Sequence, residues 1–271
     1  MDMQNLSIRF LGTGNAYAQS LGNSACVLEN SSGPLLLIDC GHSTINAFES
    51  TYPNAKIPAL FVTHAHYDHI GGLERLFYRL ITTPNYKHQP KFFCPVELLP
   101  LLQQRIANYP SNLAEGGVNF WDAFHLIPVA DGFWYQNMYF NVFPVRHHNP
   151  NSAFGITLRG HFFYSGDTKP IPEILVQFAN SGEIILHDCG IEPNPAHTAL
   201  SDLHREYKPE QWQRMILYHY ESEAAGTKLE AAGFTVAKPN TAYPLVAKAS
   251  SDVKKIVASP PSVSLHYCSP N

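Results

Sequence analysis

The sequence of 271 residues contains little charge and no excess of basic residues. Charged residues make up 15% of the chain, whereas about 25% is usual in globular proteins. Lys+Arg is 18 and Asp+Glu is 22, which gives a formal net charge of -4. A broad basic footprint of the kind that binds polyanions is missing, so tRNA or DNA is disfavoured as the main partner.

Paired cysteines and long apolar runs are also missing. The cysteines are odd in number, scattered and without a CxxC pair: Cys26, Cys40, Cys94, Cys189 and Cys268. Neither a disulfide framework nor a cysteine zinc site is therefore expected. No apolar run approaches the roughly 18–20 residues that cross a bilayer, and the first residues lack the pattern of a signal peptide. We expect a soluble cytoplasmic protein without a membrane partner.

Short apolar runs bounded by Gly, Pro, Asn or Ser recur along the chain and alternate with helical patterns. This alternation favours layered α/β architecture over an all-β sandwich. Strands are expected at 7–11, 25–28, 35–38, 59–63, 140–145, 153–158, 162–165, 184–186 and 215–218. Helices are expected at 70–81, 96–107, 172–179, 209–214 and 222–232. No linker divides the chain, which predicts one domain over 1–245 and a partly irregular tail over 246–271.

Histidine is abundant, with 14 residues, and its placement follows the predicted strands. Five apolar runs each deliver a side chain that can bind metal at or just beyond their C-terminal ends. These side chains are His64, His147, Asp167, Asp188 (after His187) and His219. In layered α/β proteins that end of the strands is where sites are built.

The sharpest motif is His64-Ala65-His66-Tyr67-Asp68-His69, followed by Ile70-Gly71-Gly72-Leu73. His64 and His66 are two residues apart, so at a strand end their side chains point the same way. Asp68 and His69 lie on the turn into the next helix and can present ligands to a second ion. Four ligand-type residues within six positions rarely occur without a metal.

This HxHxDH motif after an apolar strand resembles the metallo-β-lactamase superfamily. Supporting segments occur in the family's order from about residue 6 to residue 220. They are Phe10-Leu11-Gly12-Thr13-Gly14, Leu37-Ile38-Asp39-Cys40-Gly41, Pro144-Val145-Arg146-His147, Ser165-Gly166-Asp167-Thr168 and Leu217-Tyr218-His219-Tyr220. The opening FLGTG and the pairing of His187-Asp188 with His197-Thr198 resemble the ribonuclease Z and phosphodiesterase branch. The resemblance implies an αββα sandwich, two mixed sheets with helices on the outer faces.

The resemblance further implies two divalent metal ions per chain. It places His64, His66 and His147 on one ion, Asp68, His69 and His219 on the other, and Asp167 between them. His148, adjacent to His147, is an alternative ligand. Such nitrogen and oxygen ligands suit Zn²⁺ and also Mn²⁺ or Fe.

Three further residues extend this interpretation. Asp39 resembles a structural carboxylate that orients the metal ligands without binding the metal itself. Asp188 and His197 resemble a Glu and a His that ribonuclease Z uses around the scissile phosphate, with Asp188 one methylene shorter than the Glu. A carboxylate beside His197 could keep that imidazole protonated for the leaving oxygen; the alternative is a capped loop histidine.

The resemblance implies a metal-dependent hydrolase, and the substrate we expect is a small phosphodiester such as a cyclic nucleotide. Two ions about 3.5–4 Å apart activate a water and neutralise charge on a phosphodiester. Three other functions remain open: a ribonuclease Z-like endonuclease that processes tRNA 3′ ends, a thioester or lactone hydrolase, and a non-catalytic metal-binding regulatory protein. Relatives of this superfamily are often homodimers, so a homodimer is expected by analogy.

Overall fold

The computed structural model describes residues 5–82, 88–108, 117–180 and 182–245. Its strands form two sheets of seven strands each. The predicted C-terminal tail, 246–271, lies outside the described residues. Among the described residues no helix combines the length and apolar character needed to cross a membrane.

The first sheet has the strand order β14-β1-β2-β3-β4-β5-β6. Its strands are β1 (Ser7–Gly12), β2 (Ala25–Asn30), β3 (Gly33–Ile38), β4 (Ala59–Phe61), β5 (Lys91–Pro95), β6 (His125–Val129) and β14 (Thr241–Pro244). The pairings from β14 to β3 are antiparallel, and those from β3 to β6 are parallel. The sheet is therefore mixed, as predicted.

The second sheet has the order β13-β12-β11-β10-β9-β8-β7. Its strands are β7 (Gly132–Tyr135), β8 (Met138–Pro144), β9 (Phe154–Leu158), β10 (Phe162–Tyr164), β11 (Ile184–Asp188), β12 (Met215–Tyr218) and β13 (Thr235–Val236). Pairings from β7 to β10 are antiparallel, and those from β10 to β13 are parallel. The parallel strands β10, β11 and β12 bring their carboxyl ends to one edge.

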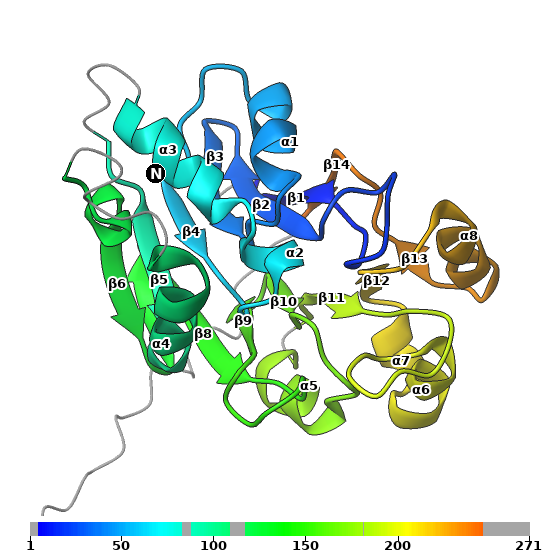
Figure 1. Cartoon of the computed structure of the whole chain (residues 1–271). Coiled ribbons are helices and arrows are strands. Elements are labelled where there is room, and N and C mark those ends of the chain that lie inside the picture. Colours follow the sequence, from blue (N-terminus) through cyan, green and yellow to red (C-terminus); the bar gives the residue numbers. More distant parts are fainter. Residues whose placement is uncertain (1–4, 83–87, 109–116, 181, 246–271) are drawn as a thin grey trace, which may run out of the picture.

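Helices cover the outer faces of the two sheets (Figure 1). They are α1 (Thr44–Thr51), α2 (Tyr67–Ile70), α3 (Leu73–Thr82), α4 (Leu99–Leu102), α5 (Pro172–Phe178), α6 (Leu200–Glu206), α7 (Pro209–Trp212) and α8 (Glu223–Ala231). Shorter 3₁₀ or π turns are η1 (Val96–Leu98), η2 (Gln103–Ala107) and η3 (Phe120–Ala123). Figure 1 shows α1 and α3 on the side of the first sheet and α5, α6 and α7 on the other. The predicted sandwich is confirmed.

Aromatic side chains fill the space between the sheets. Phe10 on β1 and Tyr218 on β12 have ring centroids 5.5 Å apart, and Phe61 on β4 stacks on Phe133 of β7 at 6.1 Å. All four are buried. Fully burying such a side chain contributes roughly 1.5–3 kcal/mol, so this layer holds the sheets, and the loops at their edge, in fixed relation.

The predicted helix over 70–81 is interrupted in the structure. Helix α2 ends at Ile70 and α3 begins at Leu73, and between them Gly72 packs against the backbone that follows β3. A Cβ on Gly72 would meet the carbonyl oxygen of Gly41 at 2.3 Å, and a Cβ on Gly41 would meet that of Asp68 at 2.0 Å. This close backbone contact requires glycine and seats α2 against the β3–α1 turn.

Candidate metal centre

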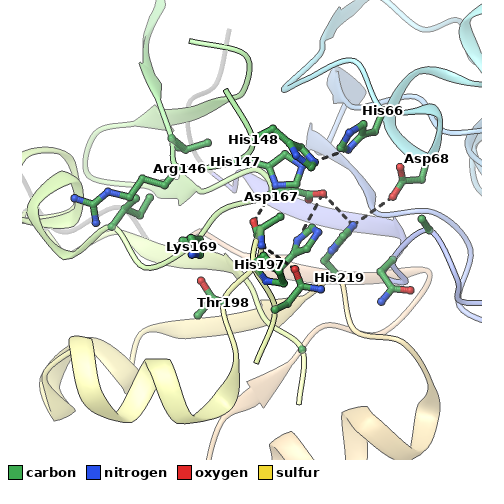
Figure 2. A pocket seen from close by; sticks show the side chains of 18 of the residues that line it. His66, Asp68, Arg146, His147, His148, Asp167, Lys169, His197, Thr198 and His219 are labelled. Carbon is green, nitrogen blue, oxygen red and sulfur yellow. Dashed lines mark hydrogen bonds and ion pairs between the residues drawn. The ribbon is translucent and has the colours of Figure 1, made fainter. Parts of the chain in front are cut away.

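The predicted metal-binding residues come from five places in the chain and meet at one edge of the sandwich. They follow strand ends or lie on α2, as predicted: His64 and His66 after β4, Asp68 and His69 on α2, His147 after β8, Asp167 after β10 and His219 after β12. Figure 2 shows Asp167 between His147 and His219.

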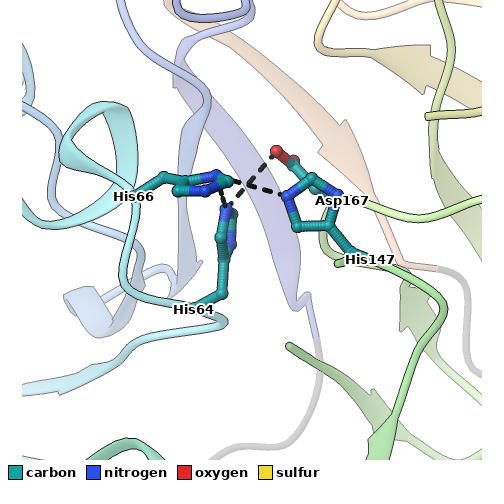
Figure 3. A group of neighbouring side chains, drawn as sticks. All are labelled: His64, His66, His147 and Asp167. Carbon is teal, nitrogen blue, oxygen red and sulfur yellow. Dashed lines mark hydrogen bonds and ion pairs between the residues drawn. The ribbon is translucent and has the colours of Figure 1, made fainter. Parts of the chain in front are cut away.

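Three histidines and Asp167 form the first group (Figure 3). Nδ1 of His66 lies 3.0 Å from Nε2 of His64 and 3.2 Å from Nε2 of His147. Oδ2 of Asp167 lies 3.6 Å from Nε2 of His64. One ligand atom from each of the four residues lies within 4.8 Å of the others, so the group is compact enough to surround one ion.

The second group shares Asp167 with the first. Oδ2 of Asp167 lies 3.2 Å from Nε2 of His69 and 3.2 Å from Nε2 of His219. Oδ2 of Asp68 lies 3.4 Å from each of the same two nitrogen atoms. One carboxylate thus faces both groups, the arrangement that a bridging ligand requires.

The structure distinguishes the adjacent histidines 147 and 148. His147 is buried and belongs to the first group. His148 is exposed, with a left-handed backbone at φ 55°, and its ring stands edge-on to that of His66 at 4.7 Å. This placement favours His147 over His148 as the ligand.

Partners behind the ligands fix which ring nitrogen faces the centre. Nδ1 of His69 lies 2.9 Å from Oδ2 of Asp39, so its Nε2 is turned inward. The Asp39 carboxylate also accepts hydrogen bonds from the backbone N–H and the hydroxyl of Thr63, and that hydroxyl lies 3.0 Å from Nδ1 of His64. Nδ1 of His147 donates to the carbonyl of Ala196 at 2.9 Å. Such partners orient metal ligands and raise their basicity.

Asp188 lies between two imidazoles. Its Oδ2 is 2.8 Å from Nδ1 of His197 and accepts a hydrogen bond from the backbone N–H of Thr168 at 2.9 Å. Its Oδ1 is 3.4 Å from Nδ1 of His219. The structure therefore brings the predicted pair of Asp188 and His197 into contact and connects it to a residue of the second group.

Two residues of this centre have strained backbone conformations. Asp39 and His219 adopt left-handed conformations, with φ of 64° and 67°. For residues other than glycine such conformations cost on the order of 1–3 kcal/mol each and persist where the surroundings impose them. Asp39 supports His69, and His219 faces Asp68 and Asp167, so the strain is located where ligand orientation matters.

The buried polar atoms fit divalent cations. Oδ1 of Asp167 and Nε2 of His69 are buried and have no hydrogen-bond partner in the part of the chain that the structure describes. Burial would lower the pKa of His219, but Asp167, Asp188 and Asp68 raise it to about 10. Burial would raise the pKa of Asp167, but His219 and His69 hold it well below its usual value. Positive charge thus stabilises the buried carboxylates, and a metal ion would supply that charge.

The centre opens into a pocket of about 1350 Å³. Arg146 and Lys169 line it together with His197, and Figure 2 shows both cations on the side of the pocket away from Asp68. Arg146 pairs with Glu173 at 2.9 Å. A pocket of this size admits a small molecule, and its lining carries acidic as well as basic side chains.

Comparison with known proteins places the chain in a family. The family model described as Anti-Pycsar protein Apyc1 matches residues 6–243. The chain belongs to the Apyc1 family. The Apyc1 protein of Paenibacillus xerothermodurans is 31% identical over 230 residues, covering 81% of this chain and 89% of the relative. The Apyc1 protein of Bacillus phage BSP38 is 27% identical over 240 residues, covering 80% and 90%.

Solved structures support the same fold for this Apyc1 family member. The metallo-β-lactamase fold protein YhfI from Bacillus subtilis has a TM-score of 0.69 at 15% identity, covering 89% of this chain and all of that one. A diphosphatase of the PhnP family has a TM-score of 0.70 at 17% identity, covering 90% and 100%. The short form of human tRNase Z has a TM-score of 0.64 at 18% identity, covering 89% and 99%. The predicted metallo-β-lactamase-like fold is confirmed. Family and buried cluster together identify a metal-dependent hydrolase, also as predicted.

Some residues at the site were missed by sequence reasoning. Thr63 directly precedes His64, and its hydroxyl connects Asp39 with that histidine. Its position directly before the HxHxDH motif is the sequence signal that could have identified Thr63. Arg105 and His42 also line the pocket. No sequence pattern distinguishes them from surface residues, since their elements reach the site only in the fold.

Proposed function

We propose that this protein hydrolyses a phosphodiester bond of a small cyclic nucleotide with the help of two divalent ions. The observation that carries the proposal is the carboxylate of Asp167, which faces two separate groups of ligand side chains. Membership in the family of Anti-Pycsar proteins Apyc1 supports the same class of activity.

The residues that hold the ions would be His64, His66 and His147 for one and Asp68, His69 and His219 for the other, with Asp167 serving both. When bound, two such cations lower the pKa of a shared water and neutralise the charge of a phosphodiester. Zn²⁺ is the proposed metal, because imidazole and carboxylate ligands suit it, with Mn²⁺ and Fe as alternatives.

His197 and Asp188 would act on the leaving oxygen. Nδ1 of His197 is engaged by Asp188, so Nε2 remains for the substrate. Burial lowers the pKa of His197, but the Asp188 carboxylate outweighs this effect and raises it above the usual value. The Asp188 carboxylate therefore favours the protonated form of this imidazole. As water adds to phosphorus and the P–O bond breaks, that proton passes to the leaving oxygen. Asp68 would orient the attacking water.

A single nucleotide suits the pocket better than tRNA does. The net charge is -4, and tRNA-processing enzymes hold several phosphates with a basic surface. We therefore propose that nucleic acid is not a main partner.

The protein would act as a cytoplasmic homodimer with one domain over 1–245. Size-exclusion chromatography with light scattering tests the dimer.

An activity panel tests the proposal. Metal-loaded protein is given 3′,5′-cyclic nucleotides, bis-p-nitrophenyl phosphate, pre-tRNA, a lactone and nitrocefin. Opening of the cyclic nucleotides at rates well above those for the other substrates is the expected result. Efficient turnover of pre-tRNA or of the lactone, without turnover of cyclic nucleotides, would refute the proposal and favour one of the alternative activities.

A further inference from the structure

Tyr67 presents an aromatic ring to the pocket from within the HxHxDH motif. It lies between His66 and Asp68, and its side chain is 57% exposed. It lines the same pocket as His197 and Asp167. The ring thus stands next to the ligand groups with its surface available to a molecule in the pocket.

Arg105 holds this ring from a distant part of the chain. Its guanidinium lies over the Tyr67 ring, 5.1 Å from the centroid, and it donates a hydrogen bond to the carbonyl of Ala65. A cation at this distance is attracted to the ring face. Arg105 lies on η2, a π-helical turn; such turns are frequent at functional sites. Two contacts thus fix Tyr67 and the loop between His64 and His66 together.

Tyr17 provides an internal comparison. Its ring lines the same pocket and is 87% exposed. In the described part of the chain no ring or cation contact fixes it. A ring that is already held loses less freedom when it binds a ligand. Tyr67 is therefore the better placed surface for a flat group.

We infer that Tyr67, held by Arg105, is the surface on which the nucleobase of the substrate stacks. The inference rests on the proposed function. Tyr67 immediately precedes Asp68, so its ring stands close to where the phosphate would lie, and a nucleotide carries its base one sugar away from its phosphate. Stacking on an aromatic ring strengthens binding by roughly 5- to 150-fold per base and tolerates every base, since each has a π face. Base identity is therefore not read at this surface.

Arg105 is a positioning residue in this arrangement. Its loss should weaken the binding of base-bearing substrates only as long as Tyr67 is present. Arg105→Met keeps much of the side-chain length and removes the charge. Its effect should be large in the wild-type background and small in the Tyr67→Leu background, because the two residues act through one contact.

The experiment compares two substrates on metal-loaded protein: 3′,5′-cyclic nucleotides with each base, and 1-deoxyribose 3′,5′-cyclic phosphate, which has none. Tyr67→Leu should raise KM for base-bearing substrates by roughly 5- to 150-fold, with kcat, metal content and turnover of the abasic substrate little changed. Tyr67→Phe, which keeps the ring, should retain the wild-type KM. Tyr139→Leu is the matched control, because Tyr139 is also exposed and packs on Trp134 outside the pocket lining.

Equal losses on the base-bearing and abasic substrates would overturn the inference, because Tyr67 would then support the ligand loop and not the base. An unchanged KM in Tyr67→Leu would overturn it as well. Failure of the wild-type protein to hydrolyse any cyclic phosphate is a different result, which refutes the proposed function itself and is seen without any variant.

Discussion

Nδ1 of His197 lies 2.8 Å from Oδ2 of Asp188. The other oxygen of that carboxylate lies 3.4 Å from Nδ1 of His219, whose Nε2 faces Asp167 and Asp68. One buried carboxylate therefore serves a histidine that faces the pocket and a histidine of the second ligand group. Substitutions of His197 and of Asp188 should consequently have different effects.

His197→Ala should leave the metal content intact and lower kcat by about 10²- to 10⁴-fold, the usual contribution of a general acid. The loss should shrink for p-nitrophenyl esters, whose leaving group needs little protonation. Asp188→Asn should in addition weaken metal binding by roughly 10- to 100-fold, because it also removes a partner of His219. Elemental analysis and steady-state kinetics measure both effects. Equal losses for good and poor leaving groups would exclude the acid role of His197.

Asp167→Ala should remove both ions, whereas His66→Ala should affect chiefly one. The reason is geometric: Oδ2 of Asp167 approaches His64 at 3.6 Å and His219 at 3.2 Å, while Nδ1 of His66 lies near ligand atoms of the first group. Metal stoichiometry after dialysis against a weak chelator distinguishes the two variants. Retention of both ions by Asp167→Ala would contradict the shared ligand.

Buried His187 should make folding stability depend on pH. Nδ1 donates to the carbonyl of Asp188 at 2.7 Å, and Nε2 lies 2.8 Å from the Tyr207 hydroxyl, so the ring is held neutral. Burial lowers the pKa of His187 from 6.5. The unfolded chain therefore binds a proton that the folded chain does not, and this contribution to stability is present above 6.5 and lost as the pH falls below it.

Urea unfolding of wild type and His187→Gln at pH 7.5 and 5.5 measures this effect. The variant should lose less stability on acidification, by up to about 1.4 kcal/mol per pH unit. The other titrating histidines are common to both proteins and cancel in the difference. Identical pH dependence in the two proteins would contradict the assignment.

Salt should have little effect on hydrolysis of the small substrate. A protein that grips several phosphates of a nucleic acid loses affinity with a log–log slope of about −0.7 to −0.9 per phosphate contact. A chain of net charge -4 lacks the excess of basic residues that such binding requires. Measurements of kcat/KM from low to high salt check this expectation. A steep slope together with efficient pre-tRNA cleavage would restore the ribonuclease Z interpretation.

The grouping of the candidate ligands was predictable from the sequence because these side chains follow apolar strands. His64, Asp167 and His219 each come within three residues of a strand end. Parallel pairing of β10 with β11 and of β11 with β12 then brings such ends to one edge. The Ser222 cap of α8 was also predictable, and its side chain accepts a hydrogen bond from the N–H of Ala225.

Contacts between distant segments were not predictable in the same way. Strands β5 and β6 were missed because their prolines and mixed polarity hide the period of a strand, and they complete the first sheet only by parallel pairing. The predicted helix over 96–107 is divided into η1, α4 and η2. Arg105 reaches Ala65 across 40 residues from that last turn, a contact that only the folded chain reveals.

The most direct test is a metal titration of chelated protein with a 3′,5′-cyclic nucleotide as substrate, followed by chromatography of the product and by elemental analysis. Our account predicts no turnover in the chelated protein and a rise to a plateau near two metal equivalents per chain. It also predicts that Asp167→Asn stays inactive at every metal concentration. Full activity of the metal-free protein, or unimpaired activity of Asp167→Asn, would contradict it.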